Sequence, residues 1–166
     1  MRRVIHKVVA YITHGDRLLV FRHTEHPEAG IQVPGGTMEP GESPDEAVLR
    51  EAQEETGLDA LEIRAFLGVQ ETDLARVGLE GLGYRYVYHL ELRGGAPESW
   101  LHYESTPSDG TPGPIEFEFF WVQFPDEVPE LAGDQGAFLG RLEVNLRQAS
   151  EPHSGLPRED ATPRRK

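Results

Sequence analysis

The chain has 166 residues, 37% hydrophobic and 27% charged, a length that suits one domain with a sizeable buried core. Its formal net charge of −13 argues against long nucleic acid as a partner, because binding of that kind needs a basic surface. The absence of cysteine excludes a disulfide framework, a thiolate metal site and a cysteine nucleophile. No apolar run approaches the ~20 residues of a membrane span, so we expect no membrane partner and a cytoplasmic location.

The first part of the chain predicts strands and turns ahead of a glycine-rich loop. Loose alternation of apolar and polar side chains indicates two antiparallel strands joined at a turn. A short third strand follows a polar loop. These predicted strands cover residues 4–13, 17–22 and 31–33. The third strand leads into the glycine-rich loop that begins at Pro34.

Both ends of a helix are marked in the sequence that follows this loop. Ser43 is a good N-cap, Pro44 suits the first helical turn, and Glu46 completes a capping box with Ser43. Gly57 stands where a left-handed residue commonly ends a helix. The sequence therefore predicts a helix between Ser43 and Gly57.

The predicted helix carries acidic residues on the side that should pack on the core. At about 100° per residue, an apolar stripe is formed by Ala47, Val48 and Ala52. Glu51, Glu54 and Glu55 share an arc of roughly 100° at the edge of that stripe, so like charges are crowded and partly buried. Oxygen ligands gathered in this way suit Mg²⁺ or Mn²⁺. A solvated acidic face on a surface helix is the alternative that these residues alone leave open.

Beyond this helix the chain predicts further strands and one more helix. Alternating, aromatic and β-branched side chains indicate strands over 61–71, 84–92, 100–104 and 115–124. Residues 72–83 and 105–114 are predicted loops. A second helix is expected within 134–148, where four residues supply an apolar face, namely Phe138, Leu139, Leu142 and Leu146. Residues 150–166 are rich in proline and charge, and we expect a disordered tail after a domain of residues 1–149.

Strands and helices mixed in this order predict an α/β domain with a mixed sheet. Its glycine-rich loop and acidic helix contain Gly36, five residues, Glu42, seven residues, and then the run Arg50-Glu51-Ala52-Gln53-Glu54-Glu55-Thr56-Gly57-Leu58. This pattern resembles the complete Nudix box, with every fixed position filled. The resemblance implies a Nudix-type α/β/α sandwich with a central mixed sheet, in which the box forms a loop, a helix and a second loop against that sheet.

The resemblance also implies a hydrolase that needs a divalent cation, and it gives roles to residues of the box. Glu51, Glu54 and Glu55 would be metal ligands, and the backbone carbonyl of Gly35 would be an additional one. Glu51 would also orient or deprotonate the attacking water, while Arg50 would hold a glutamate of the helix in place.

Two further box residues would support these ligands. Glu42 would act behind them or through water, and Gly36 would allow a close approach.

Residues outside the box are candidates for completing the site. Nudix enzymes often add one more acid, and three acids that follow the box are candidates here, namely Glu104, Glu116 and Glu118. Arg22 and Arg85 are candidate phosphate contacts, and Tyr84 is a candidate for stacking on a base. For each of them, a solvent-facing or core residue of a strand is the alternative interpretation.

The predicted reaction is hydrolysis of a diphosphate linkage in a nucleoside diphosphate joined to another group, most simply a nucleoside triphosphate. Mg²⁺ or Mn²⁺ is the expected cofactor, and a small nucleotide-type diphosphate is the expected partner. The alternatives are a dinucleoside polyphosphate or nucleotide-sugar hydrolase and a non-catalytic, Nudix-like nucleotide sensor. The oligomeric state stays open, a homodimer included.

Overall fold

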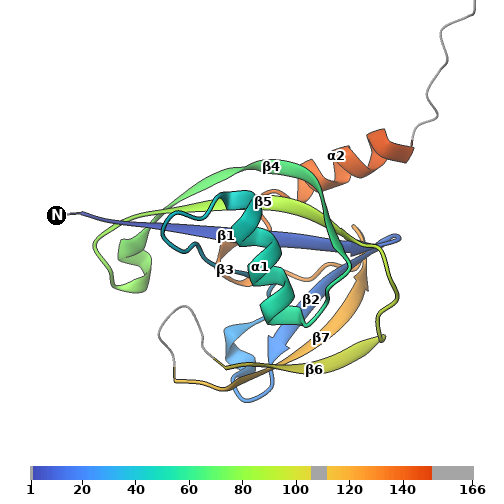
Figure 1. The fold of residues 1–166 in the computed structure, drawn as a ribbon, viewed down its shortest axis with the longest axis horizontal. Helices are drawn as coiled ribbons and strands as arrows, with labels where there is room; N and C mark the ends of the chain where they lie inside the picture. The colour runs from blue at the N-terminus through green and yellow to red at the C-terminus, as the bar shows by residue number, and fades with distance from the viewer. Residues whose placement is uncertain (1, 106–111, 151–166) are drawn as a thin grey trace, which may run out of the picture.

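A seven-stranded mixed sheet forms the centre of the structure (Figure 1). The strands are β1 (Arg3–His14), β2 (Arg17–His23), β3 (Gly35–Thr37), β4 (Leu61–Asp73), β5 (Gly81–Leu92), β6 (Ser99–Glu104) and β7 (Ile115–Gln123). In the computed structural model, which describes residues 2–105 and 112–150, the strand order is β4-β5-β1-β2-β7-β6, and β3 pairs with β1. β1 and β5 are parallel, whereas β4 and β7 pair antiparallel with their neighbours.

Two helices pack on the sheet, α1 (Pro44–Thr56) and α2 (Leu139–Ser150). Successive side chains of β1 point to opposite faces, as the pleat of a strand requires. Val8 and Ala10 therefore belong to one core cluster with the apolar stripe of α1, while Val9 and Tyr11 pack in a second cluster with Leu142 of α2. The predicted α/β/α sandwich with a mixed sheet is confirmed. The described residues also include short 3-10 helices at Pro27–Ala29, Leu74–Val77 and Ala132–Asp134.

The sheet opens between β1 and β2, and this opening positions the site. β1 pairs with β2 only beside their turn, through Thr13 with Leu18 and His14 with Arg17. Farther along, β1 pairs instead with β3, and Gly35 is the register partner of Val9. β2 continues along β7 over its whole length. The two halves of the sheet therefore diverge, and β3 lines the gap between them.

The capping residues of α1 act as predicted. The side-chain oxygen of Ser43 accepts a hydrogen bond from the Glu46 backbone at 3.2 Å, and the Glu46 carboxylate accepts one from the Ser43 backbone. Gly57 ends the helix with φ 75°, and its backbone N–H donates to the carbonyl of Gln53. Of the helices in the described part of the chain, none combines the length and the hydrophobicity needed to cross a membrane.

Two predictions near the box and beyond it were wrong in detail. Residues 31–33 form no strand but two isolated bridges, from Ile31 and Gln32, and the strand begins at Gly35 within the predicted loop. The segment 72–83, predicted as a loop, contains the end of β4, a 3-10 helix and the start of β5. β3 and the start of β5 both pair with β1, so in both places a strand distant in sequence contributes to the conformation.

The second helix extends beyond its predicted end. α2 runs to Ser150, whose hydroxyl donates to the carbonyl of Leu146 at 2.9 Å. Ser150 was the first residue of the expected tail, and residues 151–166 lie outside the described part of the chain. Residues 106–111 of the predicted loop 105–114 lie outside it as well.

A buried histidine makes the stability of the fold depend on pH. His89 of β5 is 4% exposed, and its Nε2 lies 2.7 Å from the hydroxyl of Thr13. Burial lowers the pKa of His89 from 6.5 to about 4. Below pH ~6.5 this histidine is therefore protonated in the unfolded chain, whereas in the folded chain it is protonated only near pH 4. The free energy of unfolding consequently falls as the pH drops through this window.

We predict that this histidine accounts for about 2 kcal/mol of stability lost between about pH 7 and pH 5. His89→Gln should lower stability at both pH values but show a smaller difference between them. His6→Gln, which replaces an exposed histidine of β1, is the control and should keep the wild-type difference. Urea unfolding of the three proteins at both pH values provides the measurement. An undiminished pH difference in His89→Gln would contradict the assignment.

Candidate active site

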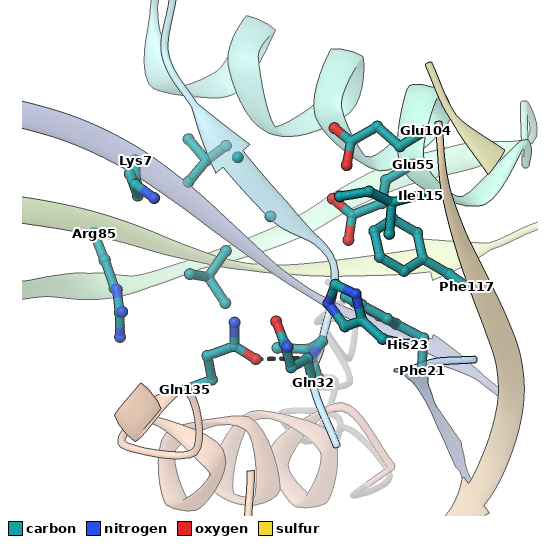
Figure 2. Close-up of a pocket in the computed structure, with 15 residues that line it drawn as sticks. Lys7, Phe21, His23, Gln32, Glu55, Arg85, Glu104, Ile115, Phe117 and Gln135 are labelled. Carbon is teal, nitrogen blue, oxygen red and sulfur yellow. Dashed lines mark hydrogen bonds between the residues drawn. The ribbon is translucent and has the colours of Figure 1, made fainter. Parts of the chain in front are cut away.

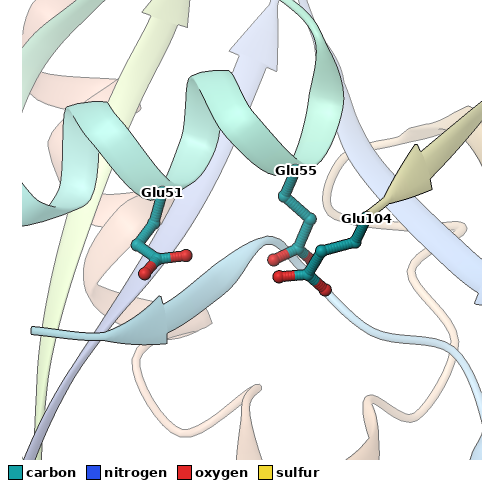
Figure 3. A group of neighbouring side chains, drawn as sticks. All are labelled: Glu51, Glu55 and Glu104. Atoms are coloured by element: carbon teal, nitrogen blue, oxygen red, sulfur yellow. The ribbon is translucent and has the colours of Figure 1, made fainter. Parts of the chain in front are cut away.

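Helix α1 directs two glutamates into the interior. Glu51 is 3% exposed and Glu55 is 5% exposed, on the same side of the helix as its apolar stripe. Glu104, at the end of β6, meets them from the other side of the gap (Figure 3). One carboxylate oxygen from each of the three residues lies within 4.8 Å of the others. The structure thus brings together two acids of the box and one of the three acids considered outside it.

Glu54 lies apart from this carboxylate cluster. Its side chain is 61% exposed, and its Oε2 accepts a hydrogen bond from Arg50 at 3.2 Å. The sequence placed Glu54 on the same arc as Glu51 and Glu55. Glu54 follows Glu51 by three residues and turns toward solvent, whereas Glu55 follows it by four and stays on the buried side. Glu54 therefore stands at the rim of the site, and the position nearest Glu55 is taken by Glu104.

Arg50 links several acceptors beside the cluster. Its guanidinium donates to Glu42 at 2.6 and 2.9 Å and to Glu51 at 2.9 Å, and it also reaches the carbonyl of Thr37 at 3.2 Å. The hydrogen bonds from Arg50 hold the pKa of Glu42 below its usual value. This geometry is compatible with the predicted part of Arg50 in holding a glutamate and with a position for Glu42 behind the cluster.

Burial and the neighbouring carboxylates act on the pKa values of the cluster. Burial raises the pKa of Glu51, and Arg50 opposes that rise. Burial raises the pKa of Glu55 well above its usual value, the charge of Glu104 raises it further, and a backbone hydrogen bond from Gly35 opposes these effects. Three carboxylates whose oxygens lie within reach of one another are a ligand set of the kind that Mg²⁺ or Mn²⁺ prefers. The residues present therefore fit a divalent cation.

Two glycines of β3 let the backbone pass close to these acids. A Cβ on Gly36 would lie 2.0 Å from Oε2 of Glu51, so any other residue would displace that carboxylate. A Cβ on Gly35 would lie 2.5 Å from the carbonyl oxygen of Val8 on β1. The predicted close approach at Gly36 has a physical basis in this contact. The Gly35 carbonyl as a ligand stays a prediction.

The cluster borders a cavity of about 160 Å³, which we call the central pocket (Figure 2). Its labelled lining residues are Lys7, Phe21, His23, Gln32, Glu55, Arg85, Glu104, Ile115, Phe117 and Gln135. Glu55 and Glu104 lie on one side, and Lys7 and Arg85 lie on the other side, on neighbouring strands. One wall of the pocket therefore carries acids that could bind a cation, and the facing wall carries cationic side chains that could bind an anion.

The other residues considered for substrate binding lie elsewhere. Arg22 donates to both oxygens of Glu118, at 3.0 and 3.1 Å, and Glu116 accepts from the hydroxyl of Thr24 at 2.7 Å. The lining of the central pocket includes none of Arg22, Glu116 and Glu118. Tyr84 lies outside this pocket too, whereas Arg85 lines it.

Sequence reasoning missed Lys7 and Gln135 as pocket residues. Lys7 could have been noticed as a cation within a strand of mostly apolar residues, two positions before Val9. Gln135 carried no such signal, because it reaches the pocket from a turn more than a hundred residues away from β1, and its Oε1 accepts a hydrogen bond from the Val33 backbone at 2.8 Å.

Comparison with known proteins identifies the family. The family profile described as NUDIX domain matches residues 3–139, which is most of the chain. The chain belongs to the Nudix family. It is accordingly a Nudix hydrolase, and these enzymes generally need divalent metal ions. A comparison with curated proteins gave no significant match.

Solved structures agree with this fold. A UDP-X diphosphatase is 21% identical with a TM-score of 0.59, the match covering 89% of this chain and 66% of that protein. A MutT Nudix hydrolase from Burkholderia pseudomallei is 23% identical with a TM-score of 0.57, covering 84% and 98%. The MutT protein from Methanosarcina mazei Go1 is 21% identical with a TM-score of 0.59, covering 90% and 98%. At these identities the likeness establishes the fold shared by the Nudix hydrolases.

We predict that Gly36→Ala weakens Mn²⁺ binding by about 10- to 100-fold, because the new methyl group occupies the space of the Glu51 carboxylate. The thermal midpoint without metal should change little, since a flexible side chain can move aside. Gly140→Ala is the matched control, because a Cβ there meets nothing within 4 Å. Calorimetric Mn²⁺ titrations of both variants decide the matter, and equal affinity for Mn²⁺ would show that Glu51 does not bind the ion.

Proposed function

We propose that this Nudix hydrolase cleaves a diphosphate linkage in a nucleoside diphosphate joined to another group, with Mg²⁺ or Mn²⁺ as cofactor. The observation that carries the proposal is the carboxylate cluster of Glu51, Glu55 and Glu104 at a pocket whose opposite wall holds Lys7 and Arg85. A polyanion can bind to so acidic a protein when positive charge faces it from both walls, from a metal ion at the carboxylates and from the two basic side chains opposite. We also propose that the substrate is a small molecule of the cytoplasm. The catalytic domain would comprise residues 1–149, and the tail would take no part in catalysis.

The residues divide the work between binding the ion and binding the substrate. Glu51, Glu55 and Glu104 would hold the ion, with Glu54 at the rim and the Gly35 carbonyl beside it. A bound Mg²⁺ or Mn²⁺ would neutralise phosphate charge and make water more acidic. Lys7 and Arg85 would contact phosphate oxygens from the opposite wall.

Glu51 is our candidate for orienting and deprotonating water. Arg50 donates to its Oε1 at 2.9 Å, which fixes the carboxylate. In the step we propose, the water oxygen forms a bond to phosphorus while the bond from phosphorus to the bridging oxygen breaks. One proton of the water passes to the carboxylate, and the bridging oxygen leaves with the second phosphorylated product. Positioning and charge neutralisation supply most of the catalysis in such reactions.

Replacing the candidate base tests the mechanism. Glu51→Gln should lower kcat by at least ~100-fold with a much smaller change in KM, the scale of a lost acid–base group. Glu62→Gln, on the exposed face of β4, is the control and should retain activity. The substrate comes from a screen of nucleotide-type diphosphates with Mg²⁺ or Mn²⁺, and hydrolysis in ¹⁸O-labelled water locates the phosphorus that is attacked. Near-normal turnover by Glu51→Gln, or label in neither product, would overturn the mechanism.

Binding without turnover would indicate a nucleotide sensor instead of an enzyme. The same screen separates these two functions, because a sensor would raise the thermal midpoint of the protein with nucleotide but release no product.

A second prediction concerns the ion. Glu55→Gln should weaken Mn²⁺ binding strongly and Glu54→Gln more weakly, because Glu55 lies in the cluster and Glu54 is exposed at its rim. Without metal, Glu55→Gln should melt at a higher temperature than the wild type, since a buried carboxylate beside Glu104 and Glu51 is lost. Mn²⁺ titration and thermal melts with and without metal are the measurements. Unchanged affinity in Glu55→Gln would remove that residue from the site.

A further inference from the structure

Strand β6 brings Glu104 to the carboxylate cluster from the edge of the sheet. Among the described residues β6 has one strand neighbour, β7, and Glu104 is the last residue of β6. The carboxylate of Glu104 lies beside that of Glu55 (Figure 3), and two like charges at this separation repel each other. Because the end of an edge strand is paired on one side only, the contacts between β6 and α1 decide whether Glu104 keeps this position.

Every second side chain of β6 faces α1. Successive residues of a strand point to opposite sides, so residues two apart share a face. Three residues of β6 are exposed, and the three that alternate with them are partly buried, namely Trp100, His102 and Glu104. Glu104 is therefore the last of three side chains that point from β6 to the same side.

Trp100 and His102 bind the C-terminal end of α1. The indole Nε1 of Trp100 donates to the carbonyl of Thr56 at 2.9 Å. Nε2 of His102 lies 2.9 Å from the carbonyl oxygen of Glu54, and because a carbonyl only accepts, this nitrogen carries the hydrogen. The last four carbonyls of a helix have no partner within it, and those of Glu54 and Thr56 are among them. β6 is thus attached to α1 at two carbonyls that the helix leaves available.

The His102 contact lies close to the carboxylates. A Cβ on Gly57 would lie 3.0 Å from Cε1 of His102, so glycine at this position lets the ring lie against the end of the helix. His102 is two residues before Glu104 on β6, and Glu54 is adjacent to Glu55 on α1. The hydrogen bond from His102 to Glu54 therefore joins the two elements beside the place where Glu104 meets Glu55.

We propose that His102 is a positioning residue of the active site. Its hydrogen bond to Glu54 holds Glu104 beside Glu55, and through Glu104 it raises the affinity of the site for a divalent ion. Trp100 attaches the same strand farther from the site, and neither residue contacts the ion. The inference rests on the proposed function, in which Glu104 is a metal ligand.

A matched pair of variants separates the hydrogen bond from the bulk of the ring. His102→Leu fills much of the space without a donor, whereas His102→Gln keeps an N–H that can reach the same carbonyl. Leu101→Ala, at the neighbouring residue that is 56% exposed, is the control on the other face of β6. Calorimetric Mn²⁺ titrations and thermal melts without metal are made on these variants, on Glu104→Gln and on the double variant His102→Leu/Glu104→Gln.

We expect His102→Leu to weaken Mn²⁺ binding at least about tenfold, the scale of a lost partner behind a metal ligand. His102→Gln and Leu101→Ala should bind Mn²⁺ nearly as tightly as the wild type. Glu104→Gln should itself bind Mn²⁺ more weakly, and adding His102→Leu to it should cause no further loss, because His102 acts through the carboxylate that is already missing.

Three results would overturn the inference. A lower thermal midpoint of His102→Leu with wild-type Mn²⁺ affinity would show that His102 only caps the helix, and the proposed function would stand. An equal loss of affinity with and without the Glu104 carboxylate would show that His102 acts independently of Glu104. Wild-type affinity in Glu104→Gln would remove Glu104 from the proposed metal site, and the inference would fail with it.

A second variant covers the case in which His102→Leu does not fold. Trp100→Phe loses the indole N–H and keeps an aromatic ring against Phe119, on which Trp100 is stacked with 5.3 Å between centroids. It should weaken Mn²⁺ binding when Glu104 is present and have no effect in Glu104→Gln. Unchanged affinity of folded Trp100→Phe would show that attachment of β6 to α1 does not control the site.

Discussion

The burial of two glutamates on the packing side of α1 is the constraint on which the site depends. Glu51 and Glu55 share a face with Ala47 and Ala52, and those alanines are fully buried against the sheet. The packing of the helix therefore holds both carboxylates inside the protein. Arg50 compensates Glu51, and its hydrogen bonds within the described residues go to Glu42, Glu51, Glu54 and the carbonyl of Thr37. The packing that stabilises the fold thus also keeps negative charge buried where a bound cation would neutralise it.

The divergence of β1 from β2 creates the space beside these carboxylates. A regular hairpin would close the gap, yet these strands pair only beside their turn. β3 enters instead and brings Gly35 and Gly36 under the helix, where the absence of side chains leaves space for the carboxylate of Glu51. A hydrogen bond from the β3 backbone reaches Glu55. The irregularity of the sheet and the acids of α1 are therefore parts of one arrangement.

Local signals explain what the sequence could predict. The helix boundaries followed from Ser43 and Gly57, and the buried acids followed from the helical period, because both depend on neighbours within one or two turns. The fold class came from the order of elements together with the family motif. Glu104 was one of three equivalent candidates, since the pairing of β6 with β7 decides which acid meets α1. Gln135 depends on a long-range contact with Val33, which no local pattern encodes.

The distribution of charge also bears on selectivity. Several arginines of the sheet surface are paired with glutamates, as Arg22 is with Glu118 and Arg93 with Glu62. Arg85 instead donates to the backbone carbonyl of Gly133 and lines the central pocket. With a net charge of −13, the protein as a whole repels polyanions, whereas the central pocket has Lys7 and Arg85 on one wall and Glu55 and Glu104 on the other. The substrate that we propose, a compact diphosphate arriving with a divalent ion, would satisfy both walls, whereas a long nucleic acid would meet an acidic protein.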